Sequence, residues 1–131
     1  MHTSEPLVTL ARLALDEATG VALSGRRRFV PFAMVDAGTG LSVHRFPGAF
    51  DDNRERALMM VRSSGTVCRA AVAWFGAVAV RGMSSSGLVV AASVIDEPES
   101  LQMAQLVEVS TRGRVRAVGG QLFVGRGPRL W

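Results

Sequence analysis

The 131-residue sequence has no lysine, no tyrosine, one cysteine and two histidines. Proton transfer and nucleophilic attack rely on a small set of side chains, and most of that set is missing or scarce here. A single cysteine cannot form an internal disulfide, which is typical of cytoplasmic proteins. These shortages predict a protein that is not an enzyme.

Long apolar runs are also missing. The longest is interrupted by Arg69, Arg81 and the polar segment 84–87, so none reaches the roughly 20 residues that cross a bilayer. Residues 1–15 lack the basic start and charge-free run of a secretion signal. The sequence therefore predicts a cytoplasmic protein that does not contact a membrane.

What is abundant is apolar side chains, at 48% against 20% charged residues, which favours a folded globular protein over a disordered one. The length suits one domain over residues 1–131, able to fold alone or with copies of itself. The net charge is +4, and all 15 basic residues counted in it are arginines. Together with abundant Ala, Gly and Val, this favours the residue bias of a GC-rich bacterial genome over selection for anion binding.

Hydrophobic periodicity predicts two helices, from Glu5 to Thr19 or slightly beyond and over 51–64, the second ending at Gly65. Gly82 to Gly87 reads as a turn. Six apolar or alternating segments are predicted as strands: Phe29–Val35, Leu41–Phe46, Val67–Arg81, Leu88–Ile95, Leu101–Thr111 and Val115–Val124. The fold class is α+β, a mainly antiparallel sheet of about six strands with two helices, in the order α-β-β-α-β-β-β-β.

The third predicted strand is apolar on both faces, whereas two helices are expected to cover only one face of the sheet. An uncovered apolar face usually marks an interface, so we expect a homodimer or a dedicated protein partner there. The alternative is that the first helix covers this second face. The expected interface residues are Arg69, Ala71, Ala73, Phe75, Ala77 and Arg81, with Ala79 on the same face.

Two arginine clusters support a rival hypothesis, because phosphate contacts need little more than positive charge in the right place. Aromatic residues, at 6%, are too scarce for a single-strand stacking platform. The alternative function is therefore a nucleic-acid-binding module that uses Arg26, Arg27, Arg28, Arg112, Arg114 and Arg116.

Metal, cofactor and catalytic sites find little support in the spacing of the possible ligands. His2, His44 and Cys68 are too scattered for a metal site, so we expect neither a metal nor a cofactor.

Asp36 precedes a glycine-rich segment and is interpreted as a turn residue that bonds its own backbone. A further possibility is a ligand pocket formed only at a dimer seam, drawing on Asp36, His44, Glu108 or arginines from two chains. The end of the chain, 127–131, is either a docking tail or an ordinary edge contact, and both readings stay open.

Four segments of the sequence form a recognisable pattern. They are the strand Phe29–Ala33, a glycine turn, a strand that ends in Arg45 and Phe46, and the segment Ala71–Gly76. This pattern, over Phe29 to Val124, resembles small bacterial α+β proteins of unknown function, although Phe75 replaces an expected acidic residue. The resemblance implies a compact bacterial domain and no activity. We therefore expect a non-enzymatic interaction domain or subunit that acts through homo- or hetero-oligomer contacts.

Overall fold

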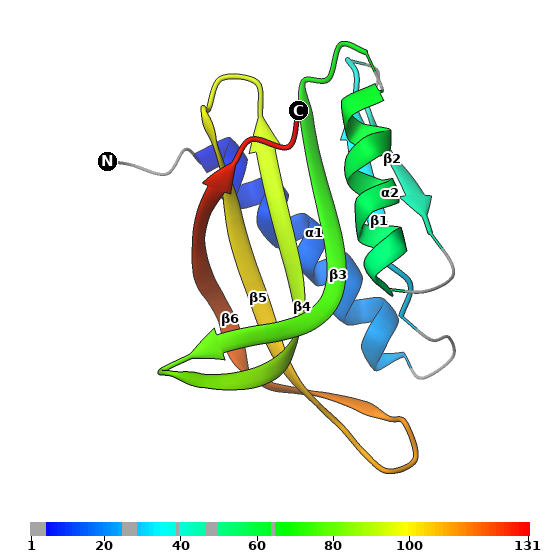
Figure 1. The fold of residues 1–131 in the computed structure, drawn as a ribbon, viewed down its shortest axis with the longest axis vertical. Coiled ribbons are helices and arrows are strands. Elements are labelled where there is room, and N and C mark those ends of the chain that lie inside the picture. Colours follow the sequence, from blue (N-terminus) through cyan, green and yellow to red (C-terminus); the bar gives the residue numbers. More distant parts are fainter. Residues whose placement is uncertain (1–4, 25–28, 39, 47–49, 64) are drawn as a thin grey trace.

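A computed structural model has the two helices and six strands in the predicted order (Figure 1). It describes residues 5–24, 29–38, 40–46, 50–63 and 65–131, with the backbone alone in 50–54. All six strands form one sheet in the order β2-β1-β3-β4-β5-β6, and every neighbouring pair is antiparallel. The α+β class is confirmed. The elements are α1 (Glu5–Leu23), β1 (Phe32–Asp36), β2 (Leu41–Arg45), α2 (Phe50–Ser63), β3 (Arg69–Val80), β4 (Met83–Val94), β5 (Glu99–Val109) and β6 (Val115–Pro128).

The two helices lie on opposite faces of the sheet, α1 behind the strands and α2 in front of them in Figure 1. The premise that they cover a single face is therefore wrong. Ala71 and Ala73 are 0% exposed beneath α1, so these two predicted interface residues are not at a surface. Their small side chains leave the space in which α1 packs closely on β3. The alternative, in which the first helix covers this face, is correct for the first half of β3, which contains Ala71 and Ala73.

The core on the α1 side follows from the helical spacing of α1. Its buried residues recur at intervals of three and four and form one apolar stripe: Leu7, Leu10, Ala11, Ala14, Leu15, Ala18 and Ala22. They pack on alternate residues of β1, β3, β4 and β5, such as Phe32 and Val90. The helix continues through Gly20 to Leu23, in line with a predicted end at Thr19 or slightly beyond, because burial of Ala22 outweighs the weak helix propensity of glycine.

The core on the α2 side combines Ala57 and Val61 of α2 with the opposite faces of the strands, including Trp74. It also holds Val78, because the long β3–β4 hairpin bends where Gly76 pairs with Gly87 and curls over this face (Figure 1). The sheet therefore closes partly around its own apolar side chains.

The predicted turn from Gly82 to Gly87 is wrong. The reversal uses only Arg81 and Gly82, with φ angles of 50° and 76°, the left-handed pair that a two-residue hairpin turn needs. The segment that follows is strand: Ser84 pairs with Ala79 and Ser86 with Ala77. The continuous ladder with β3 outweighs the turn preference of serine and glycine.

Gly87 occupies a position that a larger residue does not fit. A Cβ atom there would lie 2.9 Å from Cγ2 of Val78 and 3.2 Å from the main-chain oxygen of Gln105. We expect Gly87→Ala to lower the free energy of unfolding by about 1–3 kcal/mol, measured by urea denaturation. Gly120→Ala is the control, since a Cβ atom at Gly120 meets nothing within 4 Å. Equal losses in the two variants would contradict the close packing at the bend.

Candidate interaction surfaces

The predicted interface on β3 divides into a buried and an exposed half. Ala71 and Ala73 are covered by α1, and Phe75 is half-buried at the margin of the same core. Beyond this point α1 no longer covers the strand, and Ala77 and Arg81 are exposed, as is Ala79. We call the exposed half, with Phe75 at its base, the hairpin surface (Phe75, Ala77, Ala79 and Arg81). Its role in binding stays a prediction.

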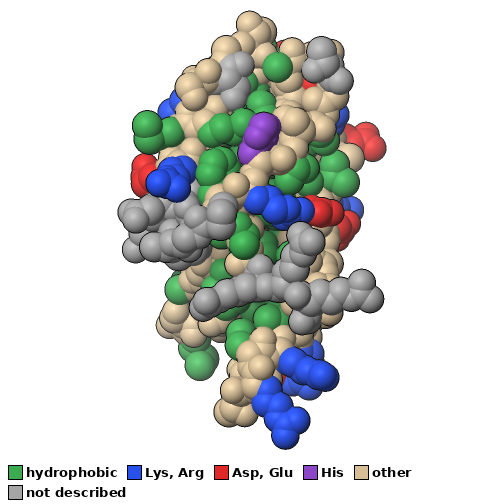
Figure 2. All heavy atoms as spheres, turned by 90° about the vertical axis from the view of Figure 1, so that its right-hand side faces the viewer, with side chains coloured by type: hydrophobic (Ala, Val, Ile, Leu, Met, Phe, Trp, Pro, Cys, Tyr) green, Lys and Arg blue, Asp and Glu red, His purple; other side chains and the backbone are tan. Residues whose placement is uncertain are grey.

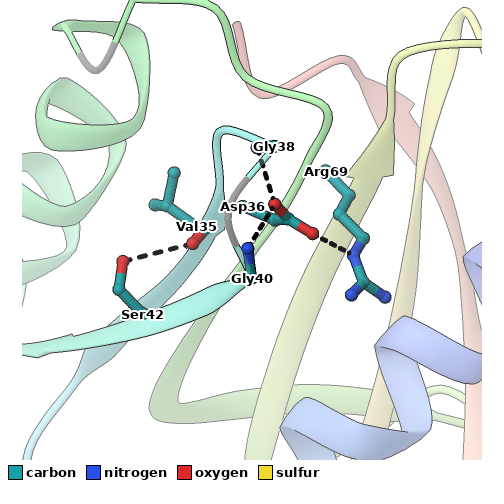
Figure 3. A network of polar contacts seen from close by, with 6 residues as sticks. All are labelled: Val35, Asp36, Gly38, Gly40, Ser42 and Arg69. Carbon is teal, nitrogen blue, oxygen red and sulfur yellow. Dashed lines mark hydrogen bonds and ion pairs between the residues drawn. The ribbon is translucent and has the colours of Figure 1, made fainter.

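Arg69, the remaining predicted interface residue, belongs to a polar cluster around Asp36 (Figure 3). Oδ1 of Asp36 accepts hydrogen bonds from the amides of Gly38 and Gly40 at 2.8 and 3.3 Å, and Oδ2 accepts one from Nε of Arg69 at 3.0 Å. The Gly38 amide, followed by Arg69, lowers the pKa of Asp36 below its usual value. The interpretation of Asp36 as a turn residue is confirmed, and its carboxylate also joins the β1–β2 turn to β3.

The three side chains considered for a seam pocket do not meet within one protomer. His44 pairs with Ala33 near the start of β1, whereas Asp36 ends that strand. Glu108 lies on β5, where it is ion-paired with Arg116. In the part of the chain that the structure describes, no three His, Cys, Asp or Glu residues are grouped so that they could hold a metal ion. Within the same residues, neither helix is long and apolar enough to span a membrane.

The second arginine cluster gathers at the tip of one hairpin. Arg112, Arg114 and Arg116 are all exposed around the β5–β6 turn. Figure 2 shows basic side chains at the lower end of the molecule, where Figure 1 places this turn. Arg116 is the member that Glu108 neutralises. The first cluster, Arg26 to Arg28, lies outside the described residues.

The end of the chain packs against its own domain. Leu130 is 6% exposed in the α2-side core, its N–H donates to Oγ of Ser93 at 3.2 Å, and its carbonyl accepts from Nε of Arg62 at 3.3 Å. Figure 1 shows the segment crossing in front of the strands to end beside β3. Of the two predictions for 127–131, a docking tail and an ordinary edge contact, the structure favours a contact within the chain, with Leu130 in the α2-side core instead of at an edge. The apolar pair Leu130 and Trp131 was the sequence signal for it.

Large apolar side chains outside both cores lie mainly on edge strands and at strand ends. The two edge strands are β2 and β6. Val43 on β2 is 44% exposed and Phe123 on β6 is 63% exposed, and Met83 at the start of β4 is 72% exposed. Hydrophobic alternation does not reveal these edges, because it indicates the face of a residue and not the place of its strand in the sheet.

The outer side of α2 adds a further apolar surface. An open hollow of about 610 Å³ is lined, among the described residues, by Arg56, Met59, Met60, Arg62 and Ser63. Met59 is largely exposed there. The hollow combines thioether side chains with two guanidinium groups, a composition that protein contacts favour.

Comparison of the chain with protein-family models, with curated proteins and with solved structures gave no significant match. The resemblance to small bacterial α+β proteins therefore stays a prediction.

Proposed function

We propose that the protein is a non-enzymatic interaction domain, or a subunit of a larger assembly, that works through homo- or hetero-oligomer contacts at the edges of its sheet. The observation that carries the proposal is the placement of exposed apolar side chains, above all Val43 and Phe123, on the two edge strands. An edge strand offers main-chain donors and acceptors to another chain, and neighbouring apolar side chains add affinity.

The arrangement of the polar side chains supports binding over catalysis. The carboxylate of Asp36 is occupied by two amides and Arg69, and that of Glu108 by Arg116. His44 lies beside Ser42, with Nε2 2.9 Å from the serine Oγ, on an exposed strand. These groups hold local structure and do not converge on one reacting atom, which general acid–base or nucleophilic catalysis requires.

The native mass tests this proposal. We expect the protein, at 13.9 kDa per chain, to form larger species in sedimentation velocity as its concentration rises, or to migrate as part of a larger complex in an extract of cells that express it. A mass of one chain, both for the purified protein at every concentration and in the extract, would contradict the proposal.

A second candidate function is nucleic-acid binding, favoured by the exposed arginines at the β5–β6 tip. A two-stranded β-ribbon fits the major groove of duplex DNA. This candidate predicts affinity for duplex DNA that falls steeply with salt, and a salt slope reduced by about one in Arg114→Ala. Arg12→Ala, on the exposed side of α1, is the control with the same net charge. Equal effects of the two substitutions, or no binding at low salt, would exclude a site at the tip.

A further inference from the structure

We infer that two copies of this chain pair through β2, antiparallel and edge to edge, around a two-fold axis at Val43. The inference rests on the proposed function and names both the partner, a second copy, and the strand that binds it. The sheets of the two copies would then join across the axis into one continuous sheet, with α1 of both copies on one face.

The hydrogen bonds between β2 and β1 determine which main-chain groups of β2 point to its open side. The amide of Phe46 donates to the carbonyl of Pro31 at 2.9 Å, so residues 42, 44 and 46 direct their main-chain groups towards β1. In an antiparallel strand the alternate residues, Leu41, Val43 and Arg45, direct both N–H and C=O away from β1. Within the described residues, nothing bonds these main-chain groups on the open side. Figure 2 looks onto this side of the molecule and shows hydrophobic side chains among polar ones.

The register of the five-residue strand is self-complementary. With the axis at Val43, this residue lies opposite its own copy, and Leu41 of one chain lies opposite Arg45 of the other. The pairs 43–43 and 41–45 then consist of residues whose N–H and C=O groups point outward. Each such pair exchanges two main-chain hydrogen bonds, which is the regular antiparallel pattern.

The side chains match in the same register. Val43 lies on the α1 side, like its neighbour Met34 on β1, so two exposed valines would meet at the axis. Arg45 faces an apolar residue, and its charge is balanced within its own chain by Glu17 at 3.1 Å. On the α2 side Ser42 faces His44, so no like charges oppose each other.

The opposite edge of the sheet is less suited to regular pairing. β6 contains extra residues relative to β5 at two places, and Gly119 has a φ of 70°. Such bulges bend an edge strand and interrupt its row of donors and acceptors, which hinders pairing with another strand. β2 pairs with β1 without a register shift, so its open edge is regular.

Substitution of Val43 by proline and by threonine tests the inference. Proline at 43 removes an N–H that points away from β1, a position that edge strands tolerate, and it places its ring in the interface. Threonine keeps the N–H and the branched shape. In sedimentation equilibrium we expect Val43→Thr to self-associate like the natural protein. We expect the dissociation constant of Val43→Pro to rise by about tenfold or more.

Circular dichroism and thermal unfolding establish that the variants are folded. If Val43→Pro does not fold, Val43→Arg replaces it, because arginines that face each other at the axis repel while the β1–β2 ladder stays intact. Self-association of a folded Val43→Pro or Val43→Arg variant at natural strength would overturn the β2 interface and leave the proposed function standing. A purified protein that is monomeric at every concentration, yet part of a larger complex in the extract, would also overturn the interface while supporting a different partner.

Discussion

Leu10→Ala is expected to lower the free energy of unfolding by about 3–5 kcal/mol. Leu10 is 0% exposed in the core between α1 and the sheet, so its loss removes buried apolar contacts and leaves a cavity. Leu13→Ala, on the same helix with the same change in helix propensity, removes a half-exposed side chain and should cost about 1 kcal/mol or less. Urea denaturation measures both losses of stability, with the same slope of unfolding free energy against urea concentration used for the two variants.

The same pair of variants tests whether α1 covers the sheet. If it does, Leu10→Ala should accelerate amide hydrogen exchange in β3 and β4, since weaker helix packing raises the population of locally open states. Leu13→Ala should leave these exchange rates close to those of the natural protein. Similar losses of stability in both variants would contradict the packing of α1 on the sheet, and the face predicted from the sequence would again be a candidate interface.

The sequence predicts the elements of this fold well, because each depends on local periodicity. The stripe of α1 and the alternation of β3 are both visible in the printed sequence, and the Asp36 turn is encoded by the glycines that follow it. Besides the turn predicted from Gly82 to Gly87, which is strand after Gly82, the wrong prediction was the side on which each helix packs. Alanines on both faces of a strand fit an open interface and a closely packed helix equally well, and the path of the chain between elements decides which of the two holds.

The candidate surfaces were less accessible to sequence reasoning, for the same reason. β2 is an edge because β3 pairs with β1 on the other side, with Phe32 opposite Ala73, a contact between segments far apart in the chain. No local pattern around Val43 reveals this. The burial of Leu130 likewise depends on Ser93 and Arg62, which lie far from it in sequence. Non-local pairing therefore determines which apolar residues stay exposed.

Leu130→Ala is expected to lower the free energy of unfolding by about 2–4 kcal/mol. The side chain is buried in the α2-side core, and hydrogen bonds to Ser93 and Arg62 hold the main chain on both sides of it. Thermal and urea unfolding measure the loss.

Arg129→Ala is the matched control, because Arg129 is exposed and its guanidinium lies 5.3 Å from the centre of the Trp131 ring. An exposed cation–π contact contributes about 0.5–1 kcal/mol, so this variant should lose little stability. Ser93→Ala should cost about 1–3 kcal/mol, because it leaves the Leu130 amide without its acceptor. Combined with Leu130→Ala it should cost less than the sum of the two, since both act on one contact. If Leu130→Ala were as mild as Arg129→Ala, the segment after β6 would not be anchored, and residues 129–131 would again be available to dock on a partner.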